Sequence, residues 1–229
     1  MVKYPSYVSN ITKCDYRKIP RTSYFFRSVL TGKLDNNYTA NALFILMNPS
    51  HATENESDKT VNSCAYIAYH DLKHLKIGSF TVVNVHPYYE ATSSDLYLIL
   101  DDLNANHNNT HLMTMKSNSL AIERAIRTNQ ESNGCIFLCT GLIPKNITDK
   151  PLYEQTIMKV HDELEKATES VYLCKGDRNK NFFSVENLSY HLSPIGSHVN
   201  QAKKFNMKNR TFIDIPNEKP ISLTHYKKK

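Results

Sequence analysis

Residues 42–50 read Ala-Leu-Phe-Ile-Leu-Met-Asn-Pro-Ser, and this stretch constrains the fold more than any other. Its apolar residues do not alternate with polar ones, which is typical of a strand buried on both faces. Asn48-Pro49 ends the strand, because proline cannot continue a ladder of backbone hydrogen bonds. A polar side chain is thus placed at the carboxyl end of a buried strand, where open parallel sheets bind their ligands. An ordinary Asn-Pro turn after a core strand explains the same residues.

Similar apolar stretches occur three more times, with helical patterns between them. The further strands are expected at 79–85, 135–140 and 170–174. Helices are expected from Asp58 to about Leu75, near 95–103, from about 117 to 127, and from Pro151 onward. Strands that alternate with helices predict a three-layer α/β/α domain around a central four-stranded, mainly parallel sheet.

Composition indicates what the remaining segments form. Residues 1–40 carry turn-forming and basic residues, which predicts an N-terminal extension packed on the main domain, with one short helix around 23–30. Residues 41–215 would form the α/β domain, and 216–229 a basic C-terminal tail. A length of 229 residues suits one such domain.

Cysteine usage and hydropathy exclude several classes of protein. The five cysteines are an odd number in mostly apolar contexts, which favours reduced core thiols over a disulfide framework. Their spacing matches no zinc or iron–sulfur site, so no metal and no cofactor are expected. Neither end carries a signal-peptide pattern, and no apolar run reaches membrane length. We therefore expect a soluble, cytoplasmic monomer that does not contact membranes.

The basic residues are unevenly distributed. The net charge of +6 is moderate, but the sequence between 197 and 213 contains no acid. The N-terminal 27 residues mix lysines and arginines with tyrosines and phenylalanines. Such mixtures can bind phosphates and stack on bases. A solvated surface and a tail would give the same pattern.

Three short motifs at the ends of these strands resemble the uracil-DNA glycosylase superfamily. Leu46-Met-Asn-Pro49 is similar to the Gly-Ile-Asn-Pro motif of that superfamily, and Val82-Val-Asn-Val85 to its Ile-Thr-Asn-Val-Val block. His191-Leu-Ser-Pro-Ile195 resembles its His-Pro-Ser-Pro-Leu-Ser loop. Residues 47–52, followed by Asp58-Lys-Thr60, also look like a bacterial and phage family described as a domain of unknown function. Some relatives of that kind are polymerase-associated uracil glycosylases of mobile genetic elements.

The resemblance implies a uracil-DNA glycosylase, an enzyme that flips uracil out of DNA and hydrolyses its N-glycosidic bond. Asn84 would read the uracil edge, His191 would stabilise the departing uracil anion, and Asn48 would position the water. The other substrate contacts expected around Asn48 are Met47, Pro49, Ser50 and, as the aromatic floor, Tyr66. Contacts to DNA are expected from Ser193, Pro194, Ile195 and Ser197 and from the basic run Lys203, Lys204, Lys208 and Arg210.

The sequence departs from the superfamily pattern in ways that affect activity. Asn48 stands where the fastest members have an aspartate, so turnover is expected to be slow. Ser50 stands where they have a tyrosine that blocks thymine. Sixteen residues separate the fourth strand from His191, where the superfamily loop follows almost immediately. His86 is an alternative catalytic histidine, and Tyr69, Tyr88 and Tyr89 are alternative aromatic residues.

Two other interpretations of the function fit the sequence. One is a non-catalytic or weakly active nucleic-acid-binding accessory protein with the same fold. The other is a nucleotide- or phosphate-binding α/β enzyme with unrelated chemistry, which the lack of a Gly-rich phosphate loop after the first strand disfavours. The partners that the leading reading implies are uracil-containing DNA and, as protein partners, a replication polymerase or a glycosylase inhibitor.

Overall fold

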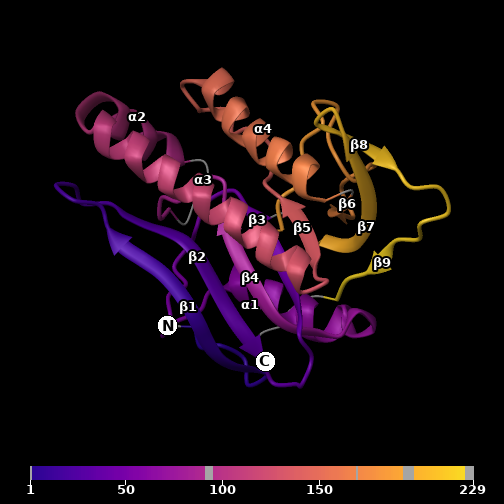
Figure 1. The fold of residues 1–229 in the computed structure, drawn as a ribbon. Helices are drawn as coiled ribbons and strands as arrows, with labels where there is room; N and C mark the ends of the chain where they lie inside the picture. The colour runs from indigo at the N-terminus through magenta and orange to yellow at the C-terminus, as the bar shows by residue number, and fades with distance from the viewer. Residues whose placement is uncertain (1, 91–94, 169, 193–198, 225–229) are drawn as a thin grey trace.

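A computed structural model describes residues 2–90, 95–168, 170–192 and 199–224 of the chain. Its strands form one mixed sheet in the order β1-β2-β4-β3-β5-β6-β7-β8, with β9 paired to β7 (Figure 1). The strands are β1 (Val8–Lys18), β2 (Phe25–Leu34), β3 (Ala40–Leu46), β4 (Ile77–Asn84), β5 (Cys135–Cys139), β6 (Ser170–Gly176), β7 (Val199–Lys208), β8 (Thr211–Asp214) and β9 (Ile221–Ser222).

The four strands expected from the apolar stretches are present as β3, β4, β5 and β6. They are neighbours and run parallel, with β3 between β4 and β5 and with β6 beyond β5. The sheet is nevertheless larger than predicted, because β2 and β1 extend it antiparallel from β4 while β7, β8 and β9 extend it antiparallel from β6. The protein is therefore a mixed α/β protein in which most strand pairings are antiparallel.

The first 40 residues belong to this sheet. The helix predicted around 23–30 is wrong, because Phe25–Leu34 is a strand that pairs with β4. Aromatic and β-branched side chains favour a strand there over a helix. β1 is largely exposed and pairs with β2 through several register shifts, as edge strands often do. The sequence of β1 is mostly polar, because only one side of an edge strand meets the core. For this reason β1 was not predicted as a strand.

The expected basic tail also contributes to the sheet. Ile221–Ser222 pairs with β7, and the side chain of Leu223 is buried. Thr224 donates hydrogen bonds from its backbone nitrogen and its hydroxyl to Asp71, with the nitrogen at 3.0 Å. The last five residues lie outside the described part of the chain.

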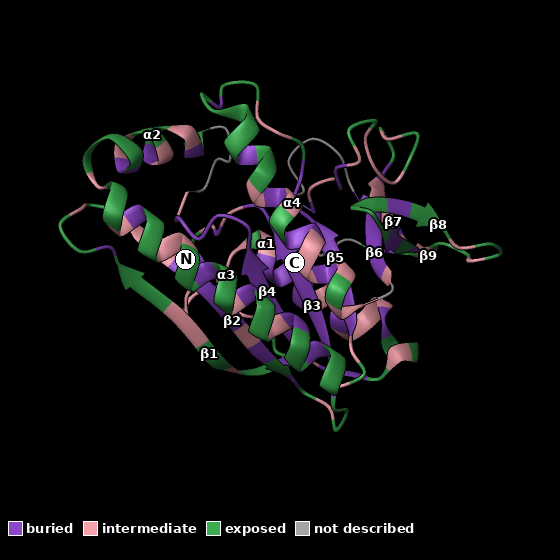
Figure 2. Cartoon of the chain, turned by 45° about the horizontal axis from the view of Figure 1, so that its top comes forward, coloured by how far each residue is buried: buried purple, intermediate pink, exposed green. Residues whose placement is uncertain are grey.

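Helices cover both faces of the sheet and give three layers (Figures 1 and 2). One face carries α1 (Lys59–Tyr66), the π-helical turn η1 (Ile67–Asp71) and the 3-10 turn η2 (Lys73–Leu75), whose apolar residues pack with Phe44, Phe80 and Phe137. The opposite face carries α2 (Leu96–Asn106), α3 (Asn108–Glu131) and α4 (Lys150–Ala167), packed on Leu43, Ile45 and Leu138. No helix of the described residues is long and apolar enough to cross a membrane.

Asp58 ties the loop after β3 to the start of α1. One carboxylate oxygen accepts the backbone N–H of Val61 at 2.8 Å and so caps the helix. The other accepts the backbone N–H of Ala52 at 2.9 Å and the hydroxyl of Ser50 at 2.5 Å. The side chain that was predicted to cap a helix therefore also fixes the chain that leaves the first parallel strand.

Asp58→Ala is expected to lower the free energy of unfolding by about 2 kcal/mol, because it removes a helix cap and two hydrogen bonds to a carboxylate. Urea unfolding measures the change. Asp58→Asn is the matched control: an amide oxygen can still cap Val61, but an amide nitrogen cannot accept from Ser50 and Ala52, so the loss should be intermediate. Equal stability of the alanine variant and the unaltered protein would show that the loop is held by other contacts.

Candidate functional site at the carboxyl ends of the parallel strands

The central parallel strands end at the same level. Leu46 of β3 pairs with Asn84 of β4 on one side and with Cys139 of β5 on the other. The pairing of β3 and β4 continues past the strand ends, since the backbone nitrogen of His86 donates to the carbonyl of Met47 at 2.8 Å. Strands lie about 4.8 Å apart, so the ends of β4 and β5 are about 10 Å from each other. A ligand of one ring can span that edge.

Asn84 is fully buried at this edge and is held by a buried arginine. Its amide oxygen accepts from Nη2 of Arg27 at 3.5 Å, while Nη1 of Arg27 donates to the carbonyl of Ala52 at 2.6 Å. Asn84 is 0 % and Arg27 1 % exposed. Within the described residues, the amide nitrogen of Asn84 and Nε of Arg27 have no hydrogen-bond partner, and no carboxylate pairs with the guanidinium. Buried donors of this kind are rare in native proteins unless a ligand or water satisfies them.

The arginine fixes the orientation of the Asn84 amide. A guanidinium is a donor at every nitrogen, so it must face the amide oxygen and not the amide nitrogen. The N–H₂ group of Asn84 therefore points to the other side. The oxygen can still accept a second hydrogen bond, because a carbonyl oxygen has two lone pairs. Asn84 thus offers a donor beside an acceptor in a fixed order.

Asn48 lies in the loop that follows β3 and is half-buried. Its amide nitrogen donates to the carbonyl of Glu90 at 2.5 Å, and the backbone nitrogen of Glu90 donates to the carbonyl of Pro49 at 3.1 Å. These two bonds join the loops after β3 and β4. Because the nitrogen of Asn48 is engaged, its oxygen is the atom that could orient a water molecule.

His191 reaches the same edge from a distant segment. The backbone nitrogen of Thr140, directly after β5, donates to Oγ of Ser189 at 2.9 Å. Gly141 follows with φ +81°, and a Cβ at that residue would lie 3.3 Å from both Cβ and Cδ2 of His191. The glycine thus allows both the turn and the close approach of the imidazole. Burial lowers the pKa of His191 to about 4, so the ring is neutral at neutral pH.

The aromatic residue beside this edge is Tyr89 and not Tyr66. Tyr66 contacts Tyr7 and His70, with ring centroids 6.4 and 4.4 Å away. Tyr7 directly precedes β1, and its carbonyl accepts a backbone hydrogen bond from Asp35, which follows β2. Because β2 ends beside the start of β4, this cluster lies at the amino ends of the parallel strands, away from Asn48. The expectation that Tyr66 lies with Asn48 is therefore wrong. Tyr89 is half-buried, follows the β4 end and contacts the rings of Tyr16 and His51.

The structure does not bring the basic run of β7 to this edge. The strand runs antiparallel to β6, so its end, with Lys208 and the following Arg210, lies at the amino ends of the parallel strands. Arg210 forms two hydrogen bonds with Asp162 of α4 at 2.5 and 2.8 Å. Lys203 pairs with Asp214 at 2.5 Å. Lys204 belongs to the same strand, opposite Tyr172. The predicted residues Ser193, Pro194, Ile195 and Ser197 lie outside the described residues.

Two other predicted substrate residues have structural contacts instead. Met47 is 1 % exposed and packs in the core under α2, α3 and α4, on the face opposite Phe44. Ser50 is bonded to Asp58. Pro49 is buried in the turn between them. Of the residues expected in one site, the structure therefore brings Asn48, Asn84 and His191 to one edge.

Arg27 was missed as a site residue because sequence reasoning counted it among surface basic residues. Its only distinguishing signal is its position inside the otherwise largely apolar stretch Phe25–Leu30. A charged residue in a buried strand costs free energy of folding unless a partner compensates its charge.

No group of three or more His, Cys, Asp or Glu side chains that could hold a metal ion occurs in the described part of the chain.

Taken together, the fold and the site define a mixed α/β protein with a buried arginine–asparagine pair at the carboxyl ends of its parallel strands. Residues 27–126 match a family described as "Protein of unknown function (DUF1643)". The matching segment is less than half of the chain; it starts at Arg27, includes Asn48 and Asn84, and ends before His191. No curated protein and no solved structure matches the chain.

Proposed function

We propose that this protein is a uracil-DNA glycosylase that uses Asn84, His191 and Asn48 at the carboxyl edge of β3, β4 and β5. The observation that supports the proposal best is the Asn84 amide, which is fully buried, oriented by Arg27 and left with a free N–H₂ group among the described residues. A uracil-DNA glycosylase-like arrangement of the central strands is part of the same proposal.

The fixed amide complements uracil. Uracil presents an N–H donor at N3 beside a carbonyl acceptor at O4, which match the oxygen and the nitrogen of Asn84. Cytosine presents the reverse order at these atoms, so its binding would leave buried polar groups unpaired. Sites of this type discriminate strongly against a ligand with the wrong hydrogen-bonding pattern.

Cleavage of the N-glycosidic bond leaves negative charge on uracil and positive charge on the sugar. A neutral His191 can donate an N–H to the uracil oxygen as the charge develops, and the guanidinium of Arg27 lies behind Asn84 as a fixed positive charge. The oxygen of Asn48 can orient the attacking water. Asn48 supplies no carboxylate, and Asp58 is occupied by three hydrogen bonds, so we infer slow hydrolysis.

The first two strands provide a surface for a DNA strand next to this site. Lys13, Lys18 and Arg21 are exposed on β1 and the turn after it. The ring of Tyr16 is 36 % exposed, stacks on Phe25 at 5.4 Å and lies beside Tyr89. Exposed cations around a stacking ring suit single-stranded nucleic acid. This surface replaces the basic run of β7 in the proposal.

Release of free uracil from a single-stranded oligonucleotide that contains one uracil tests the activity. We expect slow release of uracil, and no release from matched oligonucleotides with cytosine or thymine at that position. His191→Ala should abolish most of the release, and His74→Ala, at an exposed histidine elsewhere, should not. Absence of any released base over long incubation with excess enzyme would reject the proposed activity.

A non-catalytic nucleic-acid-binding protein is the second candidate. It is favoured by the Asn48 amide, whose nitrogen is already bonded to Glu90, and by the lack of a carboxylate at that residue. This candidate predicts binding to single strands that weakens steeply with salt, with or without uracil, and no base release.

A further inference from the structure

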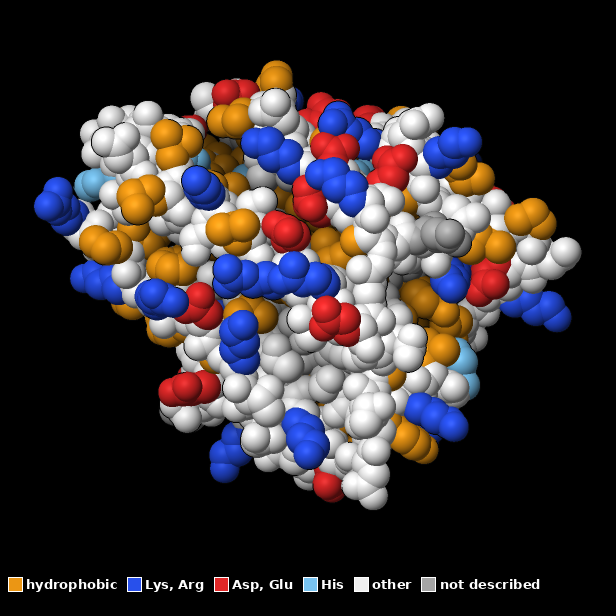
Figure 3. Space-filling model, in the orientation of Figure 1, with side chains coloured by type: hydrophobic (Ala, Val, Ile, Leu, Met, Phe, Trp, Pro, Cys, Tyr) orange, Lys and Arg blue, Asp and Glu red, His pale blue; other side chains and the backbone are white. Residues whose placement is uncertain are grey.

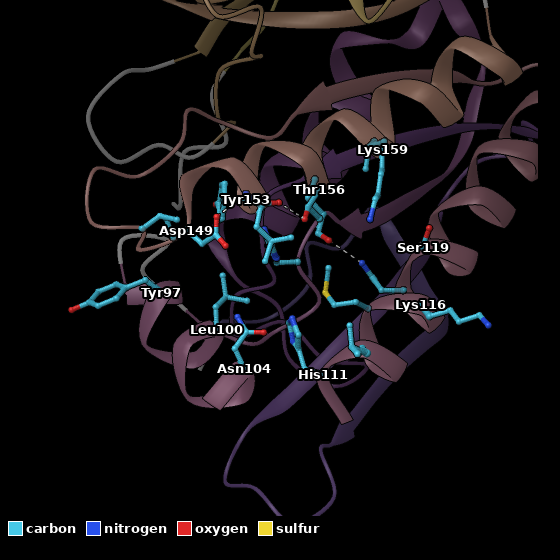
Figure 4. Close-up of a pocket in the computed structure, with 18 of the residues that line it drawn as sticks. Tyr97, Leu100, Asn104, His111, Lys116, Ser119, Asp149, Tyr153, Thr156 and Lys159 are labelled. Carbon is cyan, nitrogen blue, oxygen red and sulfur yellow. Dashed lines mark hydrogen bonds between the residues drawn. The ribbon is translucent and has the colours of Figure 1, made fainter. Parts of the chain in front are cut away.

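A cavity lies between α2, α3 and α4, the helices that cover the face of the sheet opposite α1. It has a volume of about 550 Å³, and its lining includes Val85 and His86, which follow β4. Figure 4 shows side chains of the three helices around it, among them Leu100, His111 and Tyr153. This volume lies within the ordinary range for small-molecule sites. Asn84 is not among the lining residues, so the cavity is separate from the glycosylase site proposed above.

Three buried polar side chains line this cavity without hydrogen-bond partners for some of their atoms. His86, Tyr153 and Asn118 are 3 %, 2 % and 2 % exposed. Within the described residues, neither ring nitrogen of His86, nor the hydroxyl of Tyr153, nor the side-chain oxygen of Asn118 has a partner. Unsatisfied buried groups are rare in native proteins, and three that share one cavity indicate that the cavity takes a hydrogen-bonding ligand.

The protein fixes the hydrogen-bonding pattern of these groups. The amide nitrogen of Asn118 donates to the carbonyls of Asn84 and Val85, at 2.8 and 3.1 Å, so its oxygen is oriented as an acceptor. Burial lowers the pKa of His86 to about 3, and a neutral imidazole has one donor and one acceptor. The ring of His86 stacks on that of Tyr153 at 4.6 Å. The ligand must therefore carry both donors and acceptors on one edge.

The remaining walls are apolar, and the charges lie at the rim. The apolar lining includes Leu100, Met115, Ile122, Ile147 and Val160. The charged lining residues are the basic Lys116 and Lys159 and the acidic Asp101, Asp149 and Glu163, all partly or fully exposed. Figure 3 shows the two signs interspersed over this face. Buried charge is absent from the described lining, and the rim holds no excess of cations for a phosphate.

We propose that this cavity binds an uncharged heteroaromatic compound of nucleoside size, whose polar edge meets Asn118, His86 and Tyr153 and whose ring lies against the apolar walls. This site goes beyond the proposed function and does not depend on it. An uncharged ligand follows from the neutral histidine and the balanced rim. A heteroaromatic ring combines the apolar faces and the polar edge that the cavity offers.

Protein-observed NMR with unlabelled probes at millimolar concentration tests this site. The probes are the nucleosides adenosine, guanosine, cytidine and thymidine, with AMP and benzene as comparisons. At least one nucleoside should shift the signals of residues around Tyr153 and Asn118. AMP should bind about tenfold more weakly than adenosine, and benzene should shift the same signals less. Failure of all four nucleosides, or tighter binding of AMP or benzene, would overturn the proposal.

Tyr153→Phe tests the polar edge, because it removes an unpartnered hydroxyl and leaves the ring that stacks on His86. We expect nucleoside binding to weaken about fivefold to tenfold, the loss typical of one hydrogen bond. Tyr172→Phe is the matched control, since Tyr172 is a buried tyrosine of β6 that packs on Phe137 at the opposite face. Unchanged binding by Tyr153→Phe, or an equal loss in Tyr172→Phe, would contradict the assignment.

Discussion

Replacing Asn84 with aspartate is expected to lower the rate of uracil release about 100-fold to 1,000-fold while the protein remains folded, because the change removes one oriented donor from the site. The side chains have the same shape, and Arg27 at 3.5 Å supplies a counter-charge for the carboxylate. The variant, however, presents two acceptors where uracil needs a donor beside an acceptor. Steady-state release of uracil from a single-stranded oligonucleotide measures the effect.

Two controls separate reading of the base from general damage. Asn41→Asp makes the same chemical change at the start of β3, where the side-chain oxygen accepts from Ser79 and Thr81 and a carboxylate can do the same. It should leave uracil release unchanged. Binding of the Asn84→Asp variant to an oligonucleotide without uracil should also be unchanged, because the phosphate contacts are elsewhere. Normal uracil release by the Asn84 variant would remove Asn84 from the proposed mechanism.

The central part of the fold could be predicted because its signals are local. Each of the four parallel strands is a short apolar run without alternation, and each is followed by a turn residue or a polar residue. The start of α1 is specified by Asp58, whose carboxylate caps the helix as expected. These features depend on a few neighbouring residues, so one sequence suffices to find them.

The edges of the sheet could not be predicted in the same way. β1 is exposed on much of its length and reads as a polar loop, and β7 carries alternating polar residues that resemble a basic surface run. Their pairing depends on β4 and β6, which lie far away in the sequence.

The same limit applies to the candidate site. Asn48, Asn84 and His191 were predicted to share a site because each lies at or after the end of an apolar strand, and in the structure they lie at the carboxyl ends of β3, β4 and β5. Their roles stay a prediction. The direction of β7 decides that Lys208 and Arg210 lie at the other edge, and no local signal encodes that direction. The burial of Arg27 against Asn84 likewise depends on the pairing of β2 with β4. Sequence reasoning therefore found the residues of the central strands and misjudged those of the antiparallel flanks.

Acidification is expected to destabilise this protein strongly between about pH 6.5 and pH 4, because burial lowers the pKa of several histidines, most strongly His86 and His191. Burial lowers the pKa of His86 to about 3 and that of His191 to about 4. In the unfolded chain both would have pKa values of about 6.5. Above that pH neither state binds the protons, and below it only the unfolded state does, so the stability falls with falling pH until the folded pKa values are reached.

The loss from each histidine approaches about 1.4 kcal/mol per pH unit once the unfolded imidazole is protonated, so the two together should cost about 3 kcal/mol between pH 6.5 and pH 5. Urea unfolding at several pH values measures this slope. His86→Phe, which keeps a ring against Tyr153, should remove one proton from the linkage and reduce the slope by about 1.4 kcal/mol per pH unit. His74→Phe changes an exposed histidine and should leave the slope as it is. A free energy of unfolding that stays constant from pH 6.5 to pH 5 would mean that these imidazoles accept protons in the folded protein, and the neutral His191 required for leaving-group stabilisation would then be excluded.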